Sequence, residues 1–140
     1  MTNPQQQLAE RVAEALYAGD RASQSHGIRI VEVRPGYAKL AMIVRSDMVN
    51  GHRICHGGMI FSLADTAFAC ACNSWGPVSV AAECDIIFVA PARGGDVLTA
   101  EASVRSRYGR NGIYDVTVRL DGGVIAEFRG RSSEVRLPYG

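Results

Sequence analysis

Residues 56–73 read HGGMIFSLADTAFACACN, and this stretch decides the fold. Apolar side chains fall on nearly every side of the helix that it would form, which predicts a helix buried all round. An antiparallel sheet that curls around one central helix provides that burial, whereas a pure sandwich or barrel has no place for it. We therefore predict an α+β fold in which the sheet wraps a long helix over about residues 57–74.

The segments around this helix have the patterns of one further helix and of strands. Residues 1–20 carry Leu8, Val12 and Leu16 at helical spacing behind Pro4, which predicts a short N-terminal helix. Apolar and polar residues alternate in six other segments, which predicts strands over residues 28–34, 37–45, 78–90, 96–107, 112–120 and 123–137. Because turn sequences join the later strands, we expect an antiparallel meander within one domain of residues 1–140.

The composition argues against several classes of protein. The formal net charge is +1, which implies no general affinity for nucleic acid or for anionic membranes. No apolar signal sequence occurs in the first twenty residues, and Asp65 and Asn73 interrupt the longest apolar run before it reaches the length of a membrane span. The four cysteines lack zinc-finger spacing. We therefore expect a cytoplasmic protein with reduced thiols.

The polar residues of the central helix share one of its faces. Ser62, Asp65, Thr66 and Asn73 lie there at helical spacing. Because a buried carboxylate needs partners, Asp65 is either satisfied by hydrogen bonds at a dimer contact or acts as a catalytic base or nucleophile with a raised pKa. Gly57 starts the helix with a backbone N–H that lacks an intrahelical acceptor, which suits a developing oxyanion. With Asp65 about 10 Å farther along the helix, this pattern favours acyl transfer or hydrolysis.

Other chemistry at this segment has weaker support. His52, His56 and Asp65 could form a metal triad, but glycines weaken the helix that would have to hold both histidines. Cys55 and His56 could form a nucleophile pair, but sequence neighbours in an extended loop usually point apart. Ser62 lacks the G-x-S-x-G sequence around a serine nucleophile. We therefore expect no metal site.

The same segment resembles a known family. Asn50-Gly51, His56-Gly57-Gly58 and Leu63-Ala64-Asp65 match the Asn-Gly loop, the HGG sequence and the L-A-D-x-A helix of hot-dog-fold acyl-CoA thioesterases of the PaaI (phenylacetic acid degradation) type. The similarity continues through PARGGDVLTAEA and GRNGIYDV to the end of the chain. It implies a hot-dog fold, hydrolysis of aromatic acyl-CoAs such as phenylacetyl-CoA, and no metal or prosthetic group. It also implies homodimers with active sites at the interface, usually paired into homotetramers.

The resemblance further implies roles for individual residues. Asp65 would act on the thioester directly or through water, and the Gly57 N–H would bind the oxyanion. Asn50 of the facing protomer would orient water or the nucleophile, His56 would hold the thioester region, and Thr66 would support Asp65. The CoA moiety would meet residues near the helix start and in two turns, namely Gly58, Arg93, Arg107, Arg110, Asn111 and Gly112.

Two rival functions stay open at this point. A hot-dog enoyl-CoA hydratase or dehydratase would need a histidine paired with an acid over the acyl Cα–Cβ bond. A non-catalytic acyl-CoA sensor would bind its ligand without turnover. The aromatic residues Phe61, Phe68 and Trp75 could line an acyl pocket or belong to the core.

Overall fold

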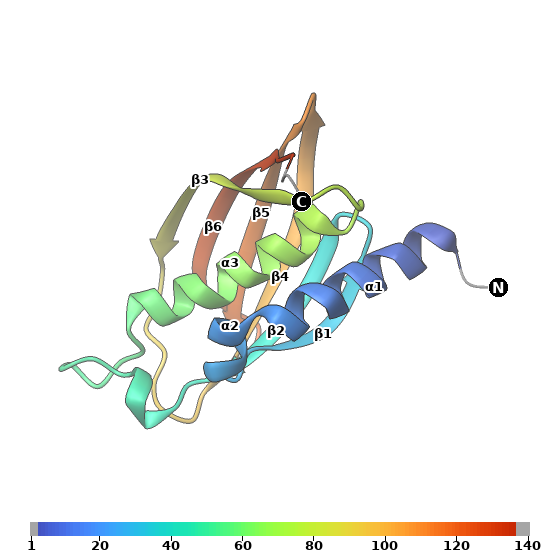
Figure 1. The fold of residues 1–140 in the computed structure, drawn as a ribbon. Coiled ribbons are helices and arrows are strands. Elements are labelled where there is room, and N and C mark those ends of the chain that lie inside the picture. Colours follow the sequence, from blue (N-terminus) through green and yellow to red (C-terminus); the bar gives the residue numbers. More distant parts are fainter. Residues whose placement is uncertain (1–2, 137–140) are drawn as a thin grey trace.

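The computed structural model describes residues 3–136 (Figure 1). The helices are α1 (Pro4–Gly19), α2 (Arg21–Ser25) and α3 (Gly57–Asn73), and a short 3-10 turn, η1 (Ser46–Met48), precedes α3. The strands are β1 (Arg29–Arg34), β2 (Tyr37–Ile43), β3 (Ser79–Phe88), β4 (Val97–Tyr108), β5 (Asn111–Leu120) and β6 (Gly123–Glu134). All predicted helices and strands are present near their expected bounds, and α2 is an addition. Within residues 3–136, no helix is both long and apolar enough to cross a membrane.

The six strands form one antiparallel sheet in the order β1-β2-β4-β5-β6-β3. Strands β4, β5 and β6 form the expected meander, with tight turns at Gly109 (φ 56°) and Gly122 (φ 83°). The expectation of a meander throughout is wrong, because β3 pairs with β6 and lies at the edge opposite β1. A connection over residues 89–96 carries the chain across to β4, and the alternation of side chains within a strand does not specify its neighbour.

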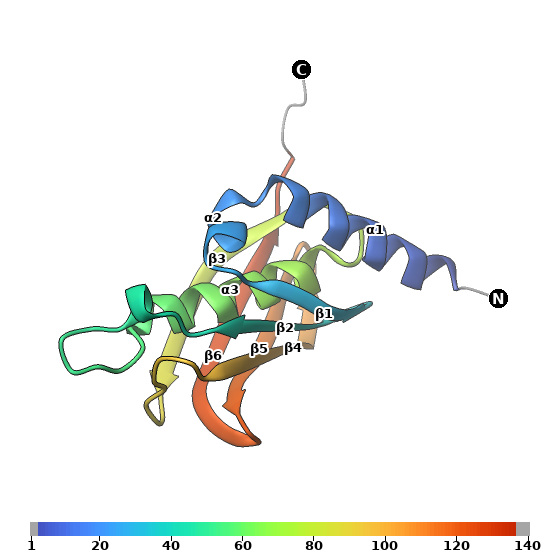
Figure 2. The same ribbon diagram turned by 90° about the horizontal axis from the view of Figure 1, so that it is seen from below.

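Helix α3 lies inside the curve of the sheet and contacts all six strands (Figures 1 and 2). At its centre, the Phe68 ring packs against Tyr114 and Phe128, with ring centroids 5.6 and 5.8 Å apart. Gly130 of β6 allows this close packing, since a Cβ there would lie 2.8 Å from Phe68 Cε2. The predicted burial is confirmed for most of the helix, and the buried apolar residues are Ile60, Leu63, Ala64, Ala67, Phe68, Cys70, Ala71 and Cys72.

Helices α1 and α2 cover the edge strand β1 and one flank of α3 (Figure 2). The Asn3 side chain caps α1 by accepting a hydrogen bond from the Gln5 N–H at 2.8 Å, and Pro4 follows in the first turn. Gln6 Nε2 donates to the Val33 carbonyl of β1 at 2.7 Å. This bond occupies an acceptor on the edge of the sheet, so α1 limits the pairing of β1 with another strand.

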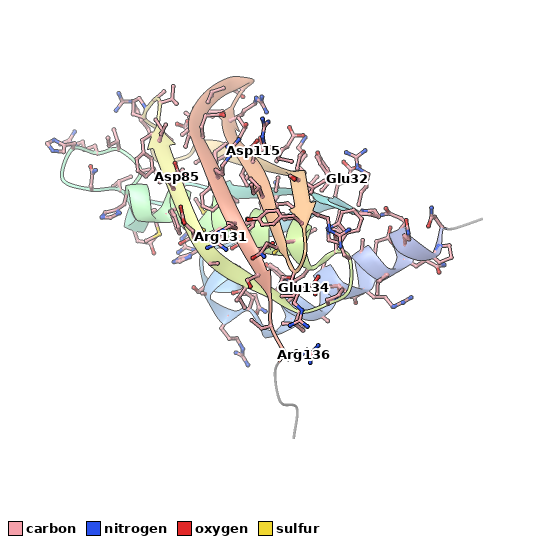
Figure 3. All side chains as sticks on the ribbon, turned by 90° about the horizontal axis from the view of Figure 1, so that it is seen from above. Glu32, Asp85, Asp115, Arg131, Glu134 and Arg136 are labelled. Atoms are coloured by element: carbon pink, nitrogen blue, oxygen red, sulfur yellow. The ribbon has the colours of Figure 1, made fainter. Side chains whose placement is uncertain are left out.

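The convex face of the sheet carries charged side chains (Figure 3). Asp115 of β5 lies 2.7 Å from Arg129 Nε of β6, and both side chains are about half exposed. Asp85 and Arg131 lie on this face beside Asp115 (Figure 3). Such exposed ion pairs contribute little to stability. The polar residues that the sequence singles out, Asp65 and Thr66, lie instead on α3, inside the curve of the sheet.

Candidate active site

Helix α3 begins with two glycines whose N–H groups are used differently. His56 is the N-cap (φ −60°, ψ 133°), and its Nδ1 accepts a hydrogen bond from the Gly58 N–H at 3.0 Å. Gly57 is the first helical residue, so its N–H has no intrahelical acceptor, and within residues 3–136 it makes no other hydrogen bond. Among the described residues, Gly57 thus presents a free donor at the positive end of the helix dipole.

The loop before α3 holds Asn50 close to Gly57. Asn50 Oδ1 accepts hydrogen bonds from the His52 N–H at 2.9 Å and the Ile54 N–H at 3.4 Å. The side-chain oxygen therefore closes its own turn, and the amide Nδ2 is the group with which Asn50 can donate to a ligand. Asn50 and Gly57 line one cavity of about 430 Å³, whose other lining residues are Ile54, Cys55, Ile60, Phe88, Val89, Ala90 and Pro91.

Asp65 lies midway along α3, on a half-buried strip of the helix. Within residues 3–136, its carboxylate makes no ion pair and no hydrogen bond. Burial raises the pKa of this carboxyl above 3.8, and the negative charge of Asp20 raises it further. Within residues 3–136, no group satisfies Asp65 by a hydrogen bond or an ion pair, and a perturbed pKa is typical of functional sites.

Thr66 is next to Asp65 but bonds elsewhere. Its Oγ1 donates to the Ser62 carbonyl at 2.8 Å and lies 2.9 Å from Ser23 Oγ. Ser23 Oγ in turn donates to Asp20 Oδ2 at 2.5 Å. The hydroxyl that was expected to support Asp65 thus connects α3 to α2, and any support that it gives to Asp65 is indirect.

Gly57 and Asp65 are separated within one chain. The two residues are eight positions apart in α3, which is about 12 Å along the axis at 1.5 Å per residue. Asp65 is also not among the residues that line the cavity at Gly57. One copy of the chain therefore joins Asn50 to Gly57 and leaves Asp65 out of direct reach of a carbonyl bound there.

The basic residues expected to bind CoA lie at the two ends of α3. Arg93 is at the end where the helix starts, because the Cys55 N–H donates to the Ala92 carbonyl at 2.7 Å. Arg107 and Arg110 are at the other end, in or beside the turn between β4 and β5. These arginines therefore do not form a single cluster within one chain.

The turn between β4 and β5 already makes contacts within the chain. The Arg107 guanidinium lies 4.0 Å above the Trp75 ring, and Asn111 Oδ1 accepts a hydrogen bond from Arg131 Nη1 at 3.3 Å. Gly112 is buried, since a Cβ there would lie 2.7 Å from Tyr114 Cε1. Arg110 lines a cavity of about 250 Å³, whose other lining residues are Pro77, Val78, Glu134, Val135 and Arg136.

The other nucleophile and metal interpretations lose support. Cys55 is buried, which raises the pKa of its thiol, and its Sγ faces the His56 carbonyl rather than the imidazole. Ser62 Oγ donates to the Gly58 carbonyl at 3.0 Å. In the part of the chain that the structure describes, no three His, Cys, Asp or Glu side chains gather as metal ligands would.

Three residues near the site were not predicted from the sequence. Asp20 caps α2 by accepting the Ser23 N–H, and an aspartate directly after Gly19 is a recognisable N-cap signal. Phe88 lies against the helix start, because a Cβ at Gly57 would be 2.9 Å from Phe88 Cζ. No local pattern marks Phe88, since its place follows from the crossing of β3 past α3. Of the aromatic residues that could line an acyl pocket or belong to the core, Phe68 is 1% exposed and belongs to the core.

Comparisons with known proteins identify the family and the fold. A model of the thioesterase superfamily matches residues 52–127. Acyl-coenzyme A thioesterase PaaI of Escherichia coli (strain K12) is 45% identical over 124 residues, which are 88% of this chain and 89% of that protein. The solved structure of the E. coli PaaI protein from the phenylacetic acid degradation operon has a TM-score of 0.92 and 42% identity, covering 94% of this chain and 96% of that chain.

A solved variant of the phenylacetic acid degradation protein PaaI from Thermus thermophilus has a TM-score of 0.81 and 33% identity, covering 83% of this chain and all of that chain. The chain belongs to the thioesterase superfamily. It has the hot-dog fold and is a thioester hydrolase, and its resemblance to the PaaI type is confirmed.

Proposed function

We propose that this enzyme hydrolyses acyl-CoA thioesters with aromatic acyl groups, of the phenylacetyl or hydroxyphenylacetyl type, to the free acid and CoA. Asp65 carries the proposal, because it is a half-buried carboxylate with a raised pKa and without a counter-ion among the described residues. It shares its helix with the free Gly57 N–H. The names of the relatives from E. coli and T. thermophilus supply the substrate class.

Hydrolysis would divide the work between Gly57 and Asp65. The thioester oxygen accepts a hydrogen bond from the Gly57 N–H, which stabilises the negative charge of the tetrahedral intermediate. Asp65 either takes a proton from the attacking water or attacks the carbonyl carbon itself, in which case water then cleaves the resulting anhydride. In both routes the C–S bond breaks and CoA leaves as a thiolate that takes up a proton. His56 keeps the helix start in place through its bond to Gly58.

The proposed active form is a homodimer, because one chain leaves about 12 Å between Gly57 and Asp65. Two α3 helices packed antiparallel would bring Gly57 and Asn50 of one copy to Asp65 of the other. The edge strand β3 supports this arrangement, since an unpaired edge favours pairing with a second strand. It and the residue after it expose apolar side chains, namely Val80, Ile87, Phe88 and Val89. Two such dimers would form the homotetramer that the resemblance implies.

A charged residue on β3 tests the dimer. Ile87 is 64% exposed in one chain, and Ile87→Asp is expected to separate the two chains of the dimer, to lower the molecular mass in solution and to abolish most activity, since it would bury a carboxylate at the interface. The matched control is Ile43→Asp at the end of β2, where Ile43 is 51% exposed and remote from β3. Light scattering and thioester cleavage are the measurements. A monomeric wild-type enzyme with full activity would refute the dimer.

For CoA, we assign the phosphates to the turn between β4 and β5. Arg110 is the best candidate because it lines an open cavity in which Arg136 is a second cation. Arg107 would then pair with Trp75 at the edge of the same site. Arg93 and Gly58 lie at the helix start and would meet the part of the ligand nearer the thioester. We expect the enzyme to act in the cytoplasm, where its four free cysteines would stay reduced.

A panel of substrates tests the reaction. Phenylacetyl-CoA, hydroxyphenylacetyl-CoA, acetyl-CoA and a medium-chain acyl-CoA are compared by release of the free thiol, and hydration of crotonyl-CoA is followed separately. The aromatic thioesters are expected to exceed the aliphatic ones at least about tenfold in kcat/KM, a difference within reach of a shaped apolar pocket. Faster cleavage of aliphatic thioesters would reject the aromatic class. Hydration without thiol release would indicate a hydratase, and binding without turnover would indicate a sensor.

A further inference from the structure

A row of hydrogen bonds joins the N-terminal part of the chain to the polar strip of α3, which is the face that carries Ser62, Asp65, Thr66 and Asn73. Asp20, the N-cap of α2, accepts the Ser23 N–H at Oδ1 (2.9 Å) and the Ser23 hydroxyl at Oδ2 (2.5 Å). Ser23 Oγ lies 2.9 Å from Thr66 Oγ1. A carboxylate can only accept, so the Ser23 proton points to Asp20, and the Thr66 proton is shared between Ser23 and the Ser62 carbonyl. The Asp20 carboxylate therefore determines the direction of hydrogen-bond donation from Thr66 through Ser23 to Asp20.

This row is shielded from solvent. Ser23 is 3% exposed, and Asp20 and Thr66 are half-buried. Asp20 and Thr66 line a cavity of about 280 Å³ between α3 and the N-terminal helices, together with Leu16, Tyr17, Gly19, Ala69 and Cys70. Its walls are largely apolar, so the charge of Asp20 acts on its neighbours with less screening than it would in water.

Asp20 is the charged group that acts on Asp65. The other ionisable groups beside Asp65 are the thiols of Cys72 on α3 and Cys84 on β3, and burial raises the pKa of both, to about 12 and about 11. These thiols are therefore uncharged at neutral pH.

The other carboxylates of the N-terminal helices and His26 face other parts of the molecule. His26, at the far end of α2, contributes to the lowered pKa of Asp47, for which Arg45 is the main cause. Glu10 and Glu14 of α1 line the groove beside β1. Asp20 is thus the one carboxylate of α1 or α2 that is directed at the polar strip of α3 within the described residues.

We propose that Asp20 is a positioning residue for hydrolysis, which fixes the flank of α3 next to Asp65 through Ser23 and Thr66. The proposal rests on the proposed role of Asp65 as the catalytic carboxylate. It gives α2 a function beyond packing, because the N-cap of this five-residue helix links α2 to the helix that carries Asp65. After burial, Asp20 is the second cause of the raised pKa of Asp65.

The variant Asp20→Asn tests this role with little change in shape. Asparagine is as good an N-cap as aspartate and keeps an oxygen for the Ser23 N–H, so α2 should remain folded. Removing the negative charge lowers the pKa of Asp65. The acidic limb of the kcat/KM profile should therefore move to lower pH, with KM at the optimum unchanged. Asp20→Ser, which also caps a helix, should give the same shift and covers the case in which Asp20→Asn folds poorly.

The matched control is Asp47→Asn, which removes an equal charge from an exposed carboxylate paired with Arg45. This control should leave the acidic limb in place. An unmoved limb in both Asp20→Asn and Asp20→Ser would overturn the proposal, and so would an equal shift in the control. These outcomes differ from failure of the proposed function, in which Asp65→Asn would retain near-normal turnover whatever the effect at Asp20.

Discussion

Replacing Gly57 by proline is expected to lower kcat about 10²–10³-fold relative to Gly57→Ala, the usual effect of losing one oxyanion donor. Proline is favoured at the first position of a helix, where its missing N–H costs no intrahelical bond. His56 already has the extended backbone (φ −60°, ψ 133°) that a residue before proline needs. Gly57→Pro therefore deletes the donor and leaves the helix start otherwise compatible with the fold.

The alanine variant makes this comparison specific. Both substitutions add a Cβ that would lie 2.9 Å from Phe88 Cζ, so both displace the same ring. Only Gly57→Ala keeps the N–H. The two purified variants are compared in kcat for thioester cleavage, with thermal melts to confirm folding. Equal rates in Gly57→Pro and Gly57→Ala would exclude the Gly57 N–H as the oxyanion donor, even if both are slower than the wild type.

Asp65→Asn is expected to lower kcat at least about 100-fold, because an amide neither accepts a proton from water nor attacks a thioester. In the wild type, activity should rise with pH as Asp65 loses its proton, with a midpoint above 3.8. The rate is measured at saturating acyl-CoA over a range of pH. Near-normal turnover of Asp65→Asn would refute the mechanism. If turnover is lost, single-turnover hydrolysis by the wild type in labelled water distinguishes attack by Asp65 from attack by water.

The same substitution should stabilise the fold. The pKa of Asp65 is higher in the folded chain than in the unfolded chain, so the folded state binds more protons between the two pKa values. The free energy of unfolding therefore falls as pH rises through this interval. Asp65→Asn removes that loss, so its Tm should exceed that of the wild type at pH 7, and the gain should shrink as the pH is lowered toward 3.8. Opposite changes in activity and stability are typical of a functional residue.

The parts of the fold that depend on local pattern were predictable. The helix over residues 57–74 was predicted from its apolar surface, and α3 has nearly these bounds. The position of β3 was not predictable, because alternation reports the faces of a strand and not its neighbour. At the site, the free Gly57 N–H could be predicted, because the first N–H of a helix has no acceptor within the helix. The links from Thr66 to Ser23 and Asp20 depend instead on how α2 docks, which no sequence period encodes.

The surroundings of Trp75 give this enzyme an optical reporter of its own. It is the only tryptophan of the chain, and its indole N–H donates to the Tyr114 hydroxyl at 2.9 Å while Arg107 lies over the ring. Tryptophan emission responds to polarity and to nearby charge. A nucleotide that engages Arg107 would change the intensity of this emission, and unfolding of the core around Tyr114 would shift its wavelength. Ligand binding and unfolding can therefore be followed separately by fluorescence, without any label.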